Sequence, residues 1–272
     1  MKHIKDYLGK ITKGDAAVVL SKIERDSVDL VVTSPPYDAL RDYCNDAIWS
    51  FESFKKIAKQ LYRVMKPGGV VVWVVGDSVV NGGKSLTSFK QALFFQKIGF
   101  SMFDVIIYEK AGSAPPHKNR YFNSFEYMFV LSKGTPNTIN IIKDKENKWG
   151  NRQTFGSVTR REKDGSLTPK GVKTINQFGA RTNIWRYNNG KGFATKDDIA
   201  YEHPAIFPEK LAADHIISWS KEGDIVLDPF AGSGTVAKMA ILLKRRWLGI
   251  EISEEYCAIA NKRIEGLCYT EQ

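Results

Sequence analysis

The sequence has few cysteines and no long hydrophobic run. Its 272 residues include three widely spaced cysteines (Cys44, Cys257 and Cys268), a spacing that fits neither a disulfide framework nor a zinc site. No apolar run reaches the roughly 18 residues of a membrane span, and the N-terminus lacks the apolar core of a secretory signal. We therefore expect a metal-free cytoplasmic protein with no membrane segment.

Two chemical signatures are also missing. None of the 10 prolines is followed by cysteine, so the Pro-Cys nucleophile used for covalent attack at carbon 6 of cytosine is absent. This absence argues against methylation of cytosine at carbon 5. No His/Cys cluster has the spacing of zinc ligands, which excludes a zinc deaminase.

Positive charge is abundant and concentrated in one segment. The formal net charge is +10, and between Lys143 and Lys196 there are 13 lysines and arginines against 4 acids, a net of +9. A strongly basic surface favours a polyanionic partner because it neutralises phosphates and releases their counterions. The alternative is an ordinary solvated loop.

Apolar runs alternate with helical patterns over most of the chain. The run at 28–32 ends at two prolines, which cannot continue a strand ladder, so we expect a buried strand that ends in a turn. Alternation continues to about residue 132 and resumes after residue 200. Helices are expected at 51–65, 86–98, 208–219, 235–243 and 254–264, and further strands at 70–75, 103–108, 125–131, 224–227 and 247–250. This pattern predicts an α/β fold with a doubly wound, mostly parallel sheet.

A glycine-rich turn lies between the expected strand at 224–227 and the expected helix at 235–243. Glycines let the backbone approach a ligand closely, and the N–H groups at the helix start face it. Gly232-Ser-Gly234-Thr-Val-Ala237 also fits the G-x-G-x-x-A dinucleotide fingerprint, with Glu251 as the ribose ligand. We expect a nucleotide-like ligand, and the glycines alone do not exclude NAD as that ligand.

The longer string Asp228-Pro229-Phe230-Ala231-Gly232-Ser233-Gly234-Thr235 resembles the cofactor motif of amino-group DNA methyltransferases. The resemblance implies that these residues bind S-adenosylmethionine rather than NAD, within a Rossmann-like methyltransferase fold. It also implies that Glu251 holds the ribose hydroxyls, which a carboxylate can do because it accepts hydrogen bonds from two donors.

A second motif comes after the strand at 28–32. An aromatic amine is a poor nucleophile because its lone pair is delocalised into the base. If Ser34 and the Pro35 carbonyl accept the two amino hydrogens, the lone pair can point at a methyl donor. Pro35 and Pro36 lock the turn, and Tyr37 offers a face on which an extruded base can stack. Ser34-Pro35-Pro36-Tyr37 resembles the family's catalytic motif, (Asp/Asn/Ser)-Pro-Pro-(Tyr/Phe/Trp), whose serine version is most frequent in N4-cytosine members.

The catalytic motif precedes the cofactor motif, an order that resembles the circularly permuted beta group of DNA methyltransferases. In an unpermuted relative Gly14-Asp15 would come after the strand that ends at Glu251, so Asp15 is a candidate contact to the cofactor adenine. Residues 203–211 resemble the family segment that closes over the methionine end of the cofactor. His203 and Phe207 are its candidate contacts.

The basic segment is predicted to recognise DNA, because guanidinium groups can clamp phosphates or contact guanine edges. The expected organisation is a catalytic half at 1–133, a target-recognition insertion at 134–200, and a cofactor-binding half at 201–272. The insertion interleaves its basic residues with Trp149, Phe155, Trp185 and Tyr187, which can stack on bases or pack the segment. The candidate DNA contacts are Arg41, after the catalytic turn, and Arg152, Arg160, Arg161, Lys163 and Arg181 in the insertion.

The resemblance implies a site-specific DNA methyltransferase of bacterial, archaeal or phage type that modifies N4 of cytosine, as in restriction-modification. Transfer to N6 of adenine uses the same geometry and is the main alternative. An NAD-dependent oxidoreductase and a non-catalytic DNA-binding protein are more distant alternatives. The expected partners are DNA and, as a second candidate, a cognate restriction endonuclease, for a protein that is a monomer or a homodimer.

Overall fold

The chain forms two units that differ in size and architecture. In the computed structural model, residues 3–36, 49–112, 119–154, 159–206 and 208–267 are described. The larger unit comprises Met1–Asn140 and Asn183–Gln272, and the smaller unit is Ile141–Thr182. We call the smaller unit the basic arm.

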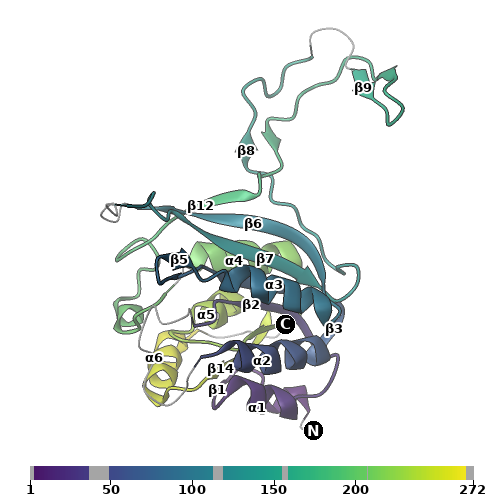
Figure 1. Cartoon of the computed structure of the whole chain (residues 1–272). Coiled ribbons are helices and arrows are strands. Elements are labelled where there is room, and N and C mark those ends of the chain that lie inside the picture. Colours follow the sequence, from purple (N-terminus) through teal and green to yellow (C-terminus); the bar gives the residue numbers. More distant parts are fainter. Residues whose placement is uncertain (1–2, 37–48, 113–118, 155–158, 207, 268–272) are drawn as a thin grey trace. The chain divides into compact units, whose positions relative to one another are not determined.

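Within the described residues of the larger unit, an eight-stranded sheet has the order β1-β14-β13-β2-β3-β7-β6-β12 (Figure 1). Strand β7 is antiparallel to its neighbours β3 and β6, and the other paired strands of this sheet are parallel. The predicted doubly wound, mostly parallel sheet is thereby confirmed. The strands are β1 (Ile11–Lys13), β2 (Val28–Thr33), β3 (Met65–Val75), β6 (Ser101–Ala111), β7 (Phe125–Ser132), β12 (Ile184–Asn188), β13 (Ile225–Asp228) and β14 (Arg246–Glu251).

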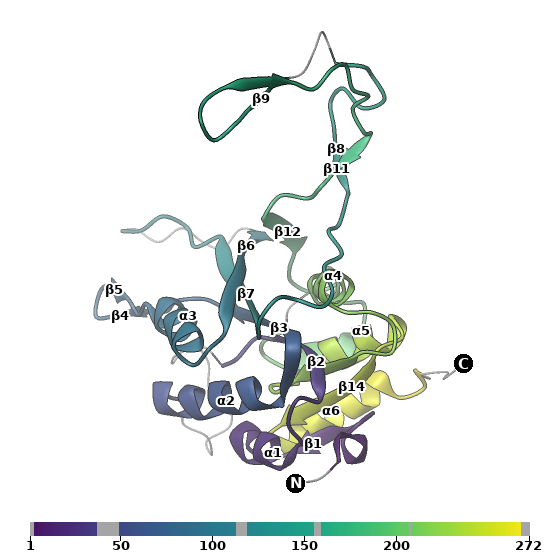
Figure 2. The ribbon, with the colours of Figure 1, turned by 90° about the vertical axis from the view of Figure 1, so that its right-hand side faces the viewer.

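Helices cover both faces of the sheet (Figure 2). One face carries α1 (Ala16–Lys22), α2 (Phe51–Val64) and α3 (Thr87–Lys97), and the other carries α4 (Glu209–Trp219), α5 (Thr235–Leu242) and α6 (Glu254–Ile264). Short 3-10 helices span η1 (Ile4–Asp6) and η2 (Asp198–Glu202), and β4 (Val79–Val80) pairs with β5 (Gly83–Lys84). Among these described helices, none is long and apolar enough to cross a membrane.

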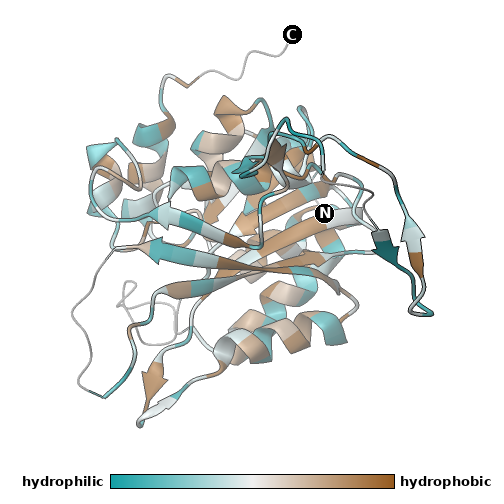
Figure 3. Cartoon of the chain, turned by 90° about the horizontal axis from the view of Figure 1, so that it is seen from above, coloured by the Kyte–Doolittle hydropathy of each residue, from teal (hydrophilic) through white to brown (hydrophobic). Residues whose placement is uncertain are grey.

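The central strands are buried on both sides, which explains their continuous apolar sequence. Leu30, Val31 and Val32 of β2 are each 0% exposed, and Figure 3 colours the central strands as mainly hydrophobic. Helix α2 packs Phe54 against Trp73 of β3, with ring centroids 5.7 Å apart. This ring contact attaches α2 to β3.

The N-terminal strand completes the sheet beside the C-terminal half of the chain. Strand β1 pairs in parallel with β14, and Lys13 lies opposite Glu251. The backbone N–H of Gly14 donates to the Glu251 carbonyl at 2.9 Å. This pairing places Asp15 next to the end of β14, as the permuted motif order predicted.

Strand β12 lies within the predicted recognition region, residues 134–200, yet it forms an edge of the main sheet beside β6. Its side chains alternate between exposed and buried, and Trp185 and Tyr187 are 7% and 4% exposed. The Tyr187 hydroxyl donates to Asp214 of α4 at 2.8 Å. Both aromatic residues therefore belong to the core, because a strand paired on one edge with β6 must bury one of its faces.

The basic arm consists of short two-stranded pairs, and none of its described residues is buried. It contains the pairs β8 (Lys145–Glu146) with β11 (Phe178–Gly179) and β9 (Thr159–Arg161) with β10 (Leu167–Pro169) (Figure 1). The predicted insertion encloses the whole arm and, on both sides, segments that belong to the larger unit.

Candidate active site

Strands β13 and β2 are neighbours from which the chain leaves toward opposite faces of the sheet. After β13 it passes through α5 to β14, and after β2 it passes through α2 to β3. Sheets of this kind bind ligands at the carboxyl ends of their strands, at such a switch point. The predicted cofactor motif comes after β13 and the predicted catalytic motif comes after β2, so both motifs lie here.

A hydrogen bond joins the two strand ends. The hydroxyl of Thr33, the last residue of β2, donates to Oδ1 of Asp228, the last residue of β13, at 2.6 Å. Oδ1 also accepts from the backbone N–H of Phe230 at 3.0 Å. Burial raises the pKa of Asp228 to about 7, and the charge of Glu251 adds to this, whereas the two hydrogen bonds oppose it. The Asp228 carboxyl, at the centre of the site, therefore titrates near neutral pH.

The loop after β13 depends on two glycines with left-handed backbone angles. Gly232 has φ +48° and Gly234 has φ +77°. A Cβ atom at Gly232 would lie 3.0 Å from Nε2 of His203, and one at Gly234 would lie 3.1 Å from Cβ of Ala260 in α6. A side chain at either position would be strained by the positive φ and would force its neighbour to shift by a few tenths of an ångström.

Glu251 closes this loop from the end of β14. Its Oε2 accepts from the N–H of Gly232 at 2.8 Å, and its Oε1 accepts from the N–H groups of Ile252 and Ser253, each at 2.9 Å. A carboxylate offers about four acceptor positions, so these three bonds leave about one for a ligand.

His203 covers the glycine loop from the end of η2. The residue is 8% exposed, and its ring meets the ring of Tyr256 edge-on, with centroids 4.3 Å apart. Its Nδ1 accepts from the N–H of Ala205 at 3.1 Å. The structure thus brings His203 to the cofactor motif, as predicted from the sequence.

The predicted catalytic turn starts directly after β2. Ser34 and Pro36 are half-buried and Pro35 is buried. Phe230 of the cofactor motif packs edge-on against Trp49 at 5.4 Å and against Trp73 at 6.1 Å. Aromatic packing therefore supports the switch point on the side of the sheet that carries α2.

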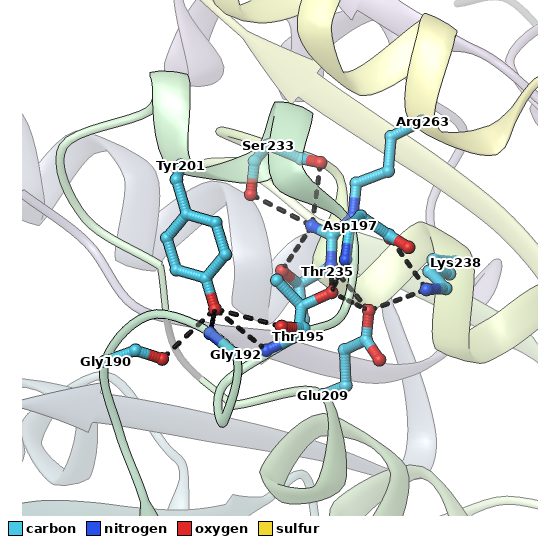
Figure 4. A network of polar contacts seen from close by, with 10 residues as sticks. All are labelled: Gly190, Gly192, Thr195, Asp197, Tyr201, Glu209, Ser233, Thr235, Lys238 and Arg263. Carbon is cyan, nitrogen blue, oxygen red and sulfur yellow. Dashed lines mark hydrogen bonds and ion pairs between the residues drawn. The ribbon is translucent and has the colours of Figure 1, made fainter.

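A buried charge network holds the loop from the opposite side (Figure 4). The Arg263 side chain, 1% exposed, pairs with Asp197 at 2.8 Å and with Glu209 at 2.7 Å. Lys238 of α5 also reaches both acids, each at 2.7 Å. Burial alone would raise the pKa of Asp197 and Glu209, but hydrogen bonds from the two cations, and at Glu209 also from the Thr195 hydroxyl, outweigh it and lower both pKa values.

Arg263 also binds the hydroxyls of the cofactor motif. Its Nη1 donates to the side chains of Ser233 and Thr235 at 3.0 Å and 2.9 Å, and to the Ser233 carbonyl at 3.0 Å. These two predicted cofactor residues therefore use their hydroxyls to fix the loop. Arg263 was not predicted from the sequence, although it occupies a buried position on α6 four residues after Ile259, where an apolar residue is usual.

Comparison with known proteins identifies the family. The model of the N6/N4 methyltransferase family, described as DNA methylase, matches residues 28–262. The chain belongs to this DNA methylase family. The methylase is 53% identical over 240 residues to M.BamHII of Bacillus amyloliquefaciens, named an orphan methyltransferase, and the match covers 88% of this chain and 89% of that protein.

Two solved structures share the fold of the methylase. The cytosine-N4-specific PvuII DNA methyltransferase has a TM-score of 0.67 at 20% identity, covering 94% of this chain and 89% of that one. The complex of M1.HpyAVI with SAM has a TM-score of 0.60 at 22% identity, covering 94% and 98%.

The other residues predicted to contact the substrate base, the cofactor or DNA differ in their local environment. Tyr37, Arg41 and Phe207 lie outside the described residues. Asp15 is exposed and caps α1 by accepting from the N–H of Val18 at 2.9 Å. Pro229 and Ala231 are buried in the loop, and the Ala231 N–H donates to the Ile250 carbonyl at 2.8 Å. Within the described residues, no group of three or more His, Cys, Asp or Glu side chains could hold a metal ion.

The predicted DNA contacts in the basic arm fall into two kinds. Arg152, Arg160, Arg161 and Lys163 are exposed. Arg181 has a side chain only 14% exposed, and its Nε donates to both carboxylate oxygens of Asp144 at 3.1 Å. That pair ties the two sides of the arm together and gives Arg181 a structural role that the sequence did not suggest.

Asp228→Asn is expected to change how stability depends on pH. The folded-state pKa near 7 lies above the value of about 3.9 for an unfolded aspartate, so the folded state binds more protons between these values. Wild-type stability therefore falls as pH rises from about 4 to 7, by at most about 1.4 kcal/mol per pH unit. Asparagine cannot titrate and keeps an acceptor for Thr33. In urea unfolding across this range, the free energy of unfolding of the variant should increase relative to that of wild type as pH rises. A difference that does not depend on pH would contradict the raised pKa of Asp228.

Arg263→Met is expected to destabilise the methylase and loosen the cofactor loop. Removing one partner of a buried ion pair costs about 3–5 kcal/mol. We expect the lower end, because the Asp197 and Glu209 side chains are 28% and 22% exposed and Lys238 remains beside them. Lys262→Met, at the exposed neighbouring position of α6, is the matched control. Equal unfolding midpoints in urea for the two variants would show that the network contributes nothing.

Proposed function

We propose that the protein transfers a methyl group from S-adenosylmethionine to the N4 amino group of cytosine in DNA. The observation that carries the proposal is the position of Ser34 at the switch point, one residue after Thr33, whose hydroxyl donates to Asp228 at 2.6 Å. Methyl transfer requires the donor and the acceptor nitrogen in contact. The motif after β13 is proposed to hold the methyl donor, and the motif after the neighbouring strand β2 is proposed to hold the acceptor nitrogen.

The glycine loop suits a nucleoside-like cofactor. The left-handed Gly232 and Gly234 let the backbone come close to a ligand, and Glu251 keeps about one acceptor position for a ribose hydroxyl. His203 lies beside the same loop, and Asp15 comes directly after Gly14, whose N–H donates to the Glu251 carbonyl. S-adenosylmethionine supplies, when bound, a methyl group on a positively charged sulfur. Membership of the DNA methylase family supports this cofactor.

The catalytic turn suits an exocyclic amine. Ser34 Oγ and the Pro35 carbonyl are acceptors for its two hydrogens, and accepting both frees the nitrogen lone pair from the ring. Proline has no N–H that would repel the amine, and its fixed φ holds the carbonyl in place. This pre-arranged geometry lowers the barrier because no protein group must reorient during transfer.

The serine in the motif favours cytosine N4 over adenine N6, since this version resembles the N4-cytosine members. Adenine N6 is the second candidate, because its amino group presents the same two hydrogens to the same acceptors. A cognate restriction endonuclease remains a prediction. The orphan designation of the Bacillus amyloliquefaciens relative favours a methyltransferase that works without one.

The basic arm supplies a surface for DNA. It carries ten lysines and arginines against four acids between Ile141 and Thr182. Phosphate neutralisation by such a segment provides affinity that does not depend on sequence and weakens with salt. We assign DNA contact to Arg152, Arg160, Arg161 and Lys163.

The first test identifies the product. Purified protein is incubated with PCR-amplified, unmethylated DNA of mixed sequence and methyl-labelled S-adenosylmethionine, and the digested nucleosides are separated by mass. We expect labelled N4-methylcytosine. Labelled N6-methyladenine would replace the proposed base by the second candidate, and absence of label in DNA despite cofactor binding would refute DNA methylation.

Ser34→Ala is expected to slow methyl transfer while leaving cofactor affinity nearly unchanged. Loss of one pre-arranged hydrogen-bonding group at a reacting centre typically costs roughly 100- to 1,000-fold in rate. Single-turnover transfer and cofactor affinity are measured separately, with the exposed Ser21→Ala as the control. Unchanged turnover in Ser34→Ala would remove Ser34 from the mechanism.

A further inference from the structure

The β9–β10 hairpin of the basic arm is a small ribbon, and among the described residues none buries either of its faces. All six residues of its two strands are exposed, and Leu167 is 58% exposed. An isolated two-stranded hairpin is only marginally stable in water, so a partner that covers one face would stabilise it.

The hairpin's turn fixes its register without a core. The N–H of Glu162 donates to the Ser166 carbonyl at 2.9 Å, and that of Gly165 donates to the Glu162 carbonyl at 3.0 Å. Asp164 accepts from the N–H and the hydroxyl of Ser166 at 3.0 Å and 2.7 Å. With the turn closed in this way, Arg161 lies opposite Leu167, and Arg160 lies opposite Thr168.

The two arginines differ in face and in pairing. Successive residues of a strand point to opposite faces, so Arg161 and Leu167 share one face and Arg160 and Thr168 share the other. Arg160 lies 3.9 Å from the carboxylate of Glu162. In the part of the chain that the structure describes, Arg161 forms no ion pair. Arg161 is therefore the arginine whose donors are available to a ligand.

We propose that the β9–β10 hairpin enters the major groove of the DNA substrate as a two-stranded ribbon, with Arg161 reading a guanine and Arg160 facing the phosphates. The inference rests on the proposed function for its substrate. The major groove, about 12 Å wide, admits a two-stranded ribbon, whereas the minor groove of undistorted DNA is only about 6 Å wide. Arginine presents a fork of donors that matches O6 and N7 of guanine, and Leu167 beside it offers an apolar contact.

Selection of bound sequences from a random duplex library tests the proposal, with full-length wild type, Arg161→Ala and Arg160→Ala compared. The two variants lose the same charge from the same hairpin, so they control for each other. We expect wild type to enrich a motif, Arg161→Ala to lose the preference at a guanine position, and Arg160→Ala to retain the motif with weaker, less salt-dependent binding. Loss of the preference in both variants, in neither, or only in Arg160→Ala would overturn the assignment, as would a wild type that enriches no motif.

A change of one DNA atom completes the test. Replacing the guanine by 7-deazaguanine removes the N7 acceptor from the major groove and leaves base pairing intact. Wild-type affinity is expected to fall roughly fivefold or more, and the affinity of Arg161→Ala to stay unchanged. Equal losses in both proteins would overturn the contact. Because these readouts are binding, they decide the hairpin's role even if the methyl-transfer assay of wild type refutes the proposed function.

Discussion

The hydrogen bond from Thr33 to Asp228 joins the two strands on which the proposed chemistry depends. The two residues are 195 positions apart in the chain, yet parallel pairing of β2 with β13 brings their strand ends within one strand spacing, about 4.8 Å. The loop that leaves β2 must therefore start beside the loop that leaves β13. The cost of burying the Asp228 carboxyl is partly offset by the hydroxyl of Thr33, so the same bond makes the close approach tolerable.

The rest of the larger unit holds the loop after β13 in place. Phe230 packs against Trp49 and Trp73 on one side, and Arg263 binds Ser233 and Thr235 on the other. A buried ion pair adds little net stability compared with apolar packing of the same volume. The Arg263 network therefore matters mainly through geometry: its directional bonds fix the loop that carries Gly232 and Gly234.

The sequence predicted the alternating elements and both motifs because these are local patterns. Each such pattern can be recognised within a few residues, as in the apolar strand at 28–32, the glycine turn at 232–234 and the final helix at 254–264. Family membership and fold were confirmed. The Arg263 network was missed because its partners lie up to 68 positions apart. Strand β12 was missed because its five residues, bordered by polar sequence, bury only two side chains.

The larger unit and the basic arm meet two different energetic requirements. Catalysis needs groups held rigidly, which the buried larger unit provides. DNA affinity needs dispersed positive charge, and each phosphate neutralised contributes roughly 0.9 to the slope of log affinity against log salt, with no demand for a packed core. An arm with ten basic residues and an exposed hairpin satisfies this second requirement at little cost to folding, since its charges stay hydrated until DNA replaces the water. In the role proposed for the arm, substitutions of its exposed residues change which DNA is bound without disturbing the bond between Thr33 and Asp228.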